Sequence, residues 1–148
     1  MSDRITIKSE SQHQAMRAAG ELTGRTLDYI GTLVKIGVST KELDEAAEAF
    51  IRKHGGIPSF LNYEGYPASI CTSVNEQIVH GIPSKKVRLK DGDIISVDCG
   101  AIIDGFNGDA ARTFLVGNVA EEVKELVRVT EECFFKGFEQ AIPGNHIC

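Results

Sequence analysis

The stretch Ser96–Phe114, SVDCGAIIDGFNGDAARTF, places Asp98 and Asp109 in a run of mostly small and apolar residues. Acidic side chains are depleted in β-strands, so two of them in one such run need a reason. The Asp104-Gly105 pair divides the stretch, and an Asp-Gly pair between two apolar runs is a strong signal for a two-residue hairpin turn. The sequence therefore predicts an antiparallel hairpin that carries two carboxylates.

The predicted turn fixes the register of this hairpin. Asp98 falls opposite Ala111, and Asp109 falls opposite Gly100. Opposed residues share a face, as do alternate residues along a strand, so both carboxylates lie on one face, about 7 Å apart as diagonal neighbours. A bulge near residues 107–108 would change this register. The other face is the expected core face and carries Ile95, Val97, Cys99, Ala101, Ile103, Phe106, Ala110 and Phe114, with Arg112 as an exception.

Two carboxylates at this spacing repel each other unless one is protonated or a cation lies between them. One interpretation is a site for divalent metal ions, for which aspartate oxygens are suitable ligands. The small neighbours Gly100 and Ala111 leave room for a ligand. Two bridged metals would lower the pKa of a shared water and supply hydroxide at neutral pH. The alternative is a solvated sheet face on which the aspartates pair with Lys or Arg, because antiparallel sheets often expose one polar face.

A second candidate region precedes the hairpin. Between residues 57 and 83, Gly, Pro and Asn recur every few positions and predict short strands and turns. His80 ends a strand-like run before Gly-Ile-Pro; most single histidines are structural or merely exposed, and this position slightly raises the odds of a functional one. Tyr63, Tyr66 and Cys71 are suited to line an apolar pocket, although such residues belong more often to a core.

Helical periodicity predicts three helices, over residues 9–35, 40–53 and 117–141. Ser9 or Ser11 is expected to cap the first, and Thr40 with Leu43 forms an imperfect capping box for the second. The third has one face formed by Val123, Leu126, Val127, Thr130, Phe134 and Phe138. Similar breaks after the first and third helices, KIGVSTKEL and IPGNHIC, suggest a weak internal repeat, and chance explains them equally well.

The composition limits the class of protein. A formal net charge of -5 argues against general binding to nucleic acid or to membrane surfaces. No apolar run approaches membrane-spanning length, and the start MSDRITIKSE lacks the apolar core of a signal peptide, so we expect a cytoplasmic protein. The four cysteines, Cys71, Cys99, Cys133 and Cys148, are widely spaced, which favours free thiols, some of them buried, over a zinc ribbon or a disulfide framework.

Two motifs carry a resemblance to a known family. NYEGYPASICTSVNEQIVHGIP (62–83) and LKDGDIISVDCGAIIDGFNGDAARTF (89–114) closely resemble the type I methionine aminopeptidases, and the resemblance runs through essentially the whole chain. It implies an α+β class, with the N-terminal half of a pita-bread fold as an antiparallel sheet covered by helices. It also implies a metal-dependent enzyme that removes the initiator methionine when the next residue is small. Its substrate would be the N-terminal methionine of nascent polypeptides, and the ribosome is a candidate partner.

The resemblance also assigns roles to the candidate residues. Asp98 and Asp109 match the family's two metal-binding aspartates, and Asp109 matches the one that bridges two divalent metal ions, for which Mn, Co, Fe and Zn are all compatible. His80 matches the catalytic histidine that contacts the substrate and helps to stabilise the reacting centre. Tyr63, Tyr66 and Cys71 match the lining of the substrate pocket, in which a methionine thioether makes favourable aromatic and sulfur contacts.

The family's second half supplies a metal-binding histidine, a second active-site histidine and two metal-binding glutamates, and their motifs are not among these 148 residues. We therefore expect residues 1–148 to form a single truncated domain, in which the second pseudo-symmetric half begins near residue 119 and is cut off. Two of five protein ligands would bind metal weakly, so the short chain is expected to be inactive alone or to need a complementing half. The alternative is a non-catalytic half-fold that binds protein N-termini or a partner. Missing partner strands also predict self-association through the exposed sheet.

Overall fold

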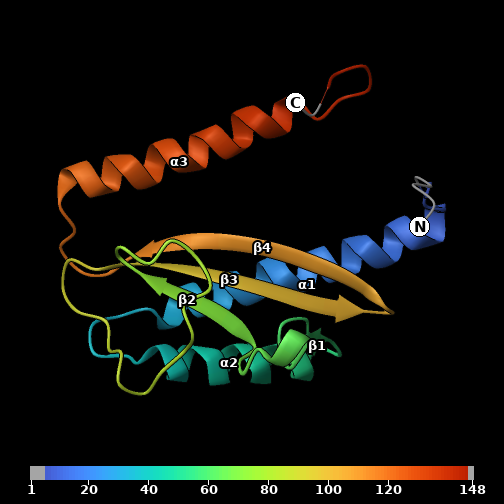
Figure 1. Cartoon of the computed structure of the whole chain (residues 1–148). Helices are drawn as coiled ribbons and strands as arrows, with labels where there is room; N and C mark the ends of the chain where they lie inside the picture. The colour runs from blue at the N-terminus through green and yellow to red at the C-terminus, as the bar shows by residue number, and fades with distance from the viewer. Residues whose placement is uncertain (1–5, 147–148) are drawn as a thin grey trace.

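The computed structural model describes residues 6–146 and has an α+β architecture, as expected. Figure 1 shows that two N-terminal helices cover one face of a twisted sheet, while the C-terminal helix stands apart, above strand β4. The elements are α1 (Glu10–Leu33), α2 (Thr40–Lys53), β1 (Ile57–Pro58), the 3-10 turn η1 (Tyr63–Gly65), β2 (Ile70–Val74), β3 (Ile94–Ile103), β4 (Phe106–Leu115) and α3 (Glu121–Glu139). All strand pairs are antiparallel, and β3 pairs with each of the other three strands.

The predicted hairpin is confirmed with its register. The β3–β4 pairing runs without interruption from Ile94 opposite Leu115 to the turn, so the suggested bulge is wrong. Asp104 and Gly105 have φ angles of 48° and 80°, the left-handed conformations that a type I′ turn requires. The turn residues therefore set the register locally, before any long-range contact contributes.

The hydrophobic core lies between the sheet and the helices α1 and α2. The predicted alternation holds along β3, where Ile95, Val97, Cys99 and Ala101 are fully buried. It fails on β4, where Ala110 is exposed, because β4 is an edge strand that α1 covers only in part. Arg112, the exception in the pattern, lies at this margin and forms an ion pair of 2.6 Å with Asp28 of α1.

Two helix caps show where local sequence was sufficient and where it misled. Ser9 caps α1 and forms a capping box with Gln12, as one of the two predicted options. The cap of α2 is Ser39 with Glu42, so the Thr40–Leu43 assignment was wrong by one residue. The correction has a physical reason, because Glu42 can accept a hydrogen bond from the Ser39 amide and leucine at the third position cannot.

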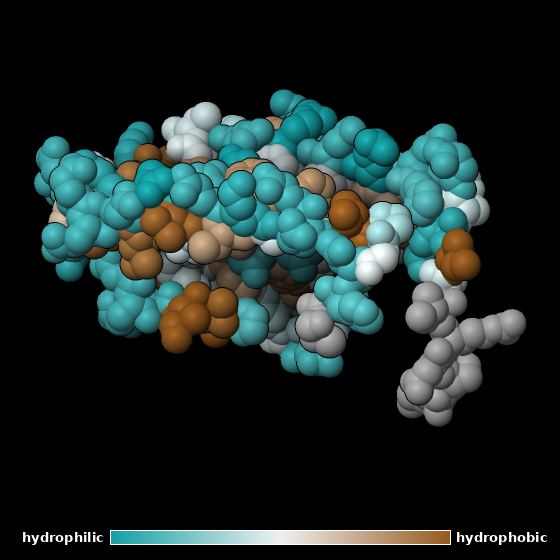
Figure 2. Space-filling view, turned by 90° about the horizontal axis from the view of Figure 1, so that it is seen from above, coloured by the Kyte–Doolittle hydropathy of each residue, from teal (hydrophilic) through white to brown (hydrophobic). Residues whose placement is uncertain are grey.

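The helix α3 forms where it was predicted, but none of its residues is buried. Leu126, Phe134 and Phe138 are 62%, 66% and 68% exposed. Figure 2, a view from above the molecule of Figure 1, shows apolar patches beside hydrophilic side chains on the face that carries α3. The apolar face expected from the pattern is therefore present, and within residues 6–146 no element covers it.

Two further sequence expectations can be compared with the fold. Within the described part of the chain, no helix is long and apolar enough to cross a membrane. Cys71, Cys99 and Cys133 are free, and the first two are buried. Cys148 and the first five residues, on which part of the localisation argument rests, lie outside the described residues.

The contact between α1 and β4 depends on a glycine. A Cβ atom on Gly108 would lie 2.4 Å from the Ala19 carbonyl oxygen and 2.6 Å from the Thr23 hydroxyl oxygen. Gly108→Ala is therefore expected to lower the free energy of unfolding by about 1–3 kcal/mol, the usual cost of overpacking, in urea titrations. Gly20→Ala is the matched control, since a Cβ there meets nothing within 4 Å and helix propensity favours alanine. Equal effects of the two substitutions would contradict the close contact.

Candidate active site

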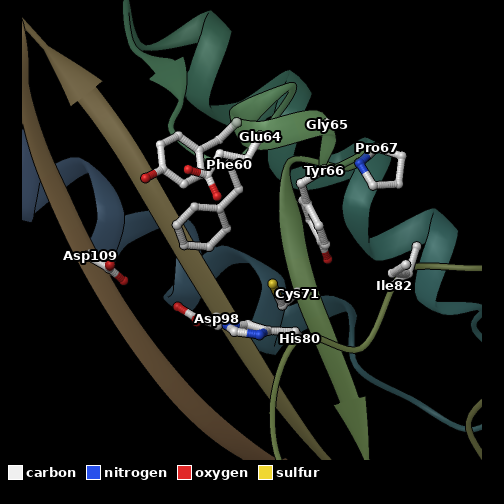
Figure 3. A pocket seen from close by; sticks show the side chains of 11 residues that line it. Phe60, Glu64, Gly65, Tyr66, Pro67, Cys71, His80, Ile82, Asp98 and Asp109 are labelled. Atoms are coloured by element: carbon white, nitrogen blue, oxygen red, sulfur yellow. The ribbon is translucent and has the colours of Figure 1, made fainter.

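The residues singled out from the sequence line one pocket of about 630 Å³. Figure 3 shows that it opens above the polar face of β3 and β4, with η1 on one side and the segment after β2 on the other. The lining residues are Phe60, Tyr63, Glu64, Gly65, Tyr66, Pro67, Cys71, His80, Ile82, Asp98 and Asp109. The structure therefore brings all six predicted site residues together, and their roles remain predictions.

Strand pairing places three of these residues side by side. Cys71 on β2 lies opposite Asp98 on β3, and Asp109 on β4 lies opposite Gly100. A Cβ on Gly100 would come within 2.8 Å of the Ser59 Cβ and 2.9 Å of the Phe60 ring. The missing side chain at Gly100 thus lets the Phe60 ring approach the two carboxylates, and a larger residue there would push this wall of the pocket outward.

The electrostatics of Asp98 follow from its surroundings. Partial burial raises the pKa of the Asp98 carboxyl above its ordinary value, and the neighbouring Asp109 carboxylate raises it further, while His80 opposes the shift. The pocket lining contains no Lys or Arg. None of the ion pairs formed among residues 6–146 involves either carboxylate. The described residues therefore give neither aspartate a Lys or Arg partner, although Asp109 is exposed to solvent as the solvated-sheet alternative expects.

Two ionisable side chains of the pocket wall, Tyr66 and Cys71, are affected by their burial. Burial raises the pKa of the Cys71 thiol and, more strongly, that of the Tyr66 hydroxyl. A buried thiol with a raised pKa is a poor nucleophile. The position of Cys71 in the lining and the raised pKa of its thiol favour a role in the pocket wall over a role as a nucleophile.

His80 reaches the pocket from a loop, so the strand-like interpretation of its run was wrong. The strand β2 ends at Val74, because Asn75 adopts a φ of 52° and turns the chain. The apolar residues that suggested a strand, Ile78 and Val79, are 89% and 64% exposed and contribute nothing to the core. His80 itself has a φ of 59°.

Sequence reasoning missed several members of the pocket. Glu64 adjoins Tyr63, Ile82 lies two residues after His80, and Phe60 lies three residues before Tyr63, so nearness in sequence to the candidates was the available signal. It also missed Asp44, a carboxylate of α2 that is 1% exposed and accepts hydrogen bonds from the amides of Ser69 and Ile70. Helical spacing was the available signal, because Asp44 lies four residues after Thr40 and three before Ala47, on the buried face of α2.

The aspartate pair fits a divalent cation in donor type and in charge. The two carboxylates repel each other, as the pKa of Asp98, raised by burial and further by Asp109, indicates, and neither has a Lys or Arg partner. Such a pair favours a cation between its members. Within the described residues, no group of three or more His, Cys, Asp or Glu side chains could hold a metal ion. Two aspartates alone would bind a metal ion weakly, so tight binding would need ligands beyond them.

The fold and the pocket can now be compared with known proteins. The sequence profile of metallopeptidase family M24 matches residues 14–148, which include the hairpin with its two aspartates and the pocket. The chain belongs to this family. It is 54% identical over 143 residues to the methionine aminopeptidase of Clostridium acetobutylicum and 49% identical over 143 residues to methionine aminopeptidase 1 of Bacillus subtilis.

Solved structures agree with this assignment. Methionine aminopeptidase from Rickettsia prowazekii matches 90% of this chain with a TM-score of 0.88 and 46% identity, and the Thermotoga maritima enzyme matches 94% with a TM-score of 0.90 and 38% identity. These likenesses confirm the expected pita-bread type of α+β fold. In both sequence comparisons above, 97% of this chain matches 57% of the relative, so the chain spans little more than half their length.

Proposed function

We propose that this chain carries the substrate pocket and part of the metal site of a methionine aminopeptidase, which removes the initiator methionine when the next residue is small. The observation that carries the proposal is the pocket that joins Asp98, Asp109 and His80 to an apolar wall. The chain's similarity to methionine aminopeptidases at 49–54% identity supports it. The substrate is then the N-terminal methionine of nascent polypeptides.

Each group in the pocket has a distinct task in this proposal. Asp98 and Asp109 would hold divalent metal, with Asp109 bridging two ions of Mn, Co, Fe or Zn. Such a metal, when bound, acidifies water and supplies hydroxide at neutral pH. His80 donates a hydrogen bond to the substrate at the reacting centre. Tyr63, Tyr66 and Cys71 enclose the methionine side chain and exclude water from it.

The proposal extends to domain organisation and setting. Residues near 119 begin the second pseudo-symmetric half, of which this sequence holds α3, and the full exposure of α3 supports this division. The protein acts in the cytoplasm, near the ribosome where nascent chains emerge. Until the apolar face of α3 is covered, the chain is expected to self-associate.

Release of methionine from a Met-Ala-Ser peptide tests the function directly. In the presence of Mn(II) or Co(II), Asp98→Ala and Asp109→Ala should each lower the turnover rate at least 100-fold relative to the unmodified chain, because each would remove a metal ligand. Glu131→Ala is the charge-matched control on α3 and should retain activity. Turnover that survives loss of both aspartates would refute the proposal.

A second candidate function is binding of protein N-termini without cleavage. It is favoured by the finding that, among residues 6–146, no group of three or more His, Cys, Asp or Glu side chains is arranged to hold a metal ion. Titration calorimetry with the same peptide distinguishes the two. Saturable binding without turnover, with or without metal, would favour the binding function, and turnover by the 148-residue chain would exclude it.

A further inference from the structure

Three hydrogen bonds hold the loop segment His80–Gly81, two to β2 and one to Tyr66. The Thr72 amide donates to the Gly81 carbonyl at 2.8 Å, and the Gly81 amide donates to the Ser73 hydroxyl at 3.1 Å. The Tyr66 hydroxyl lies 3.3 Å from the same Gly81 carbonyl and 3.1 Å from the carbonyl of Ile70, between which it can share its proton. Both backbone polar groups of Gly81, its amide and its carbonyl, are therefore hydrogen-bonded to β2, and the carbonyl is also bonded to Tyr66.

These contacts are shielded from water. Thr72 and Ser73 are 2% and 4% exposed, and hydrogen bonds in such surroundings are stronger than in solvent. Gly81 lies so close to β2 that a Cβ on it would be 2.1 Å from the Thr72 carbonyl oxygen. The loop has no room to slide along the strand while these contacts persist.

His80 itself adopts a conformation that surrounding contacts must impose. Its φ of 59° is left-handed, which is unfavourable for a residue with a side chain. Figure 3 shows its ring extending from the loop to lie beside Asp98 and Cys71. The backbone at Gly81 is fixed by the three hydrogen bonds, and it is the next residue along the chain, so these bonds determine the direction of the ring.

We propose that Ser73 and the Tyr66 hydroxyl are positioning groups for His80, holding its imidazole beside the Asp98 carboxylate. The benefit to catalysis rests on the proposed function of His80, whereas the positioning itself does not. Ser73 does not line the pocket, so any effect of its hydroxyl on a bound peptide must pass through the His80 loop. Tyr66 thus has two tasks, with its ring in the pocket wall and its hydroxyl on the loop.

Nuclear magnetic resonance of the whole chain tests the positioning without any ligand. Ser73→Ala and Tyr66→Phe should each accelerate hydrogen exchange of the Thr72 or Gly81 amide at least tenfold and broaden or split the ring signals of His80. Ser73→Thr keeps the hydroxyl and should restore the original behaviour. Gly81→Ala serves as a reference, because its Cβ must displace the loop from β2. Its His80 signals show what a released loop looks like.

The hydrogen-exchange rate of the Val97 amide is the control, because Val97 is fully buried in β3. It should rise only if the whole fold is destabilised, and not if the loop alone is released. Unchanged His80 signals in both variants, or equal acceleration at Val97 and at the loop, would overturn the proposal. Calorimetry with the Met-Ala-Ser peptide adds the functional link, with at least fivefold weaker binding expected for Ser73→Ala. If the unmodified chain binds no peptide, the proposed function fails for this chain, and the His80 signals still decide the positioning.

Discussion

Asp44→Ala is expected to destabilise the folded chain by about 2–5 kcal/mol, because it leaves two buried backbone amides without their acceptor. Asp44 is 1% exposed, and its carboxylate accepts the amides of Ser69 and Ile70 at 2.7 and 3.1 Å. Its second oxygen lies 2.6 Å from the Lys41 ammonium. Alanine would leave two buried amide donors and a partly buried ammonium without an acceptor. Urea unfolding followed by circular dichroism measures the loss.

The adjacent residue supplies the control. Glu45 is exposed on the same helix, so Glu45→Ala should change stability by no more than about 0.5 kcal/mol. Asp44→Asn keeps an acceptor oxygen for the amides but not the charge for Lys41, and it should fall between the two. Because Ile70 begins β2 directly before Cys71, the loss should also disturb the pocket wall. Equal stabilities of the Asp44 and Glu45 variants would contradict this account.

The hairpin shows what local sequence can determine. Asp104 and Gly105 form the turn by their own conformational preferences, and the turn then fixes every pairing of β3 with β4. The turn at Asp104-Gly105 was therefore sufficient to predict that Asp98 and Asp109 share a face of the sheet. The cap of α2 was also determined locally, since Ser39 and Glu42 have the spacing of a capping box. The prediction chose Thr40 in place of Ser39.

The rest of the site depends on contacts between distant segments. His80 lies where it does because Gly81 bonds to Thr72 and Ser73, which no pattern of the apolar run before it reveals. The Phe60 ring reaches the pocket only because Gly100, on another strand, has no side chain. Such packing is decided after the elements form, so the sequence indicated the members of the site better than their arrangement.

The helix α3 marks another limit. Its apolar spacing predicts that one face is to be covered, because an amphipathic helix gains most of its stability by packing that face. The spacing does not say by what. In the described chain the exposed Leu126, Phe134 and Phe138 have no such cover, so here periodicity predicted the element and not its neighbour.

Asp98→Asn is expected to have opposite effects on stability and on metal binding. Burial and the Asp109 carboxylate raise the pKa of Asp98, so at neutral pH the folded chain holds an unfavourable charge that asparagine lacks. We expect the variant to be more stable by about 0.5–2 kcal/mol, as is common when a functional site is relieved of strain. Removing one of two carboxylates should also weaken Mn(II) binding more than tenfold, as measured by calorimetry.

The pH dependence identifies the cause of this gain. Because the folded-state pKa of Asp98 is raised, its favourable contribution is complete below the ordinary carboxyl pKa and is lost as the pH rises through the folded-state value. The asparagine variant does not titrate, so its advantage should be largest at neutral pH and should disappear in acid. Asp104→Asn, in the exposed hairpin turn, is the control and should show no such trend. A variant less stable than the unmodified chain at neutral pH would mean that hydrogen bonds to the Asp98 carboxylate outweigh its repulsion from Asp109.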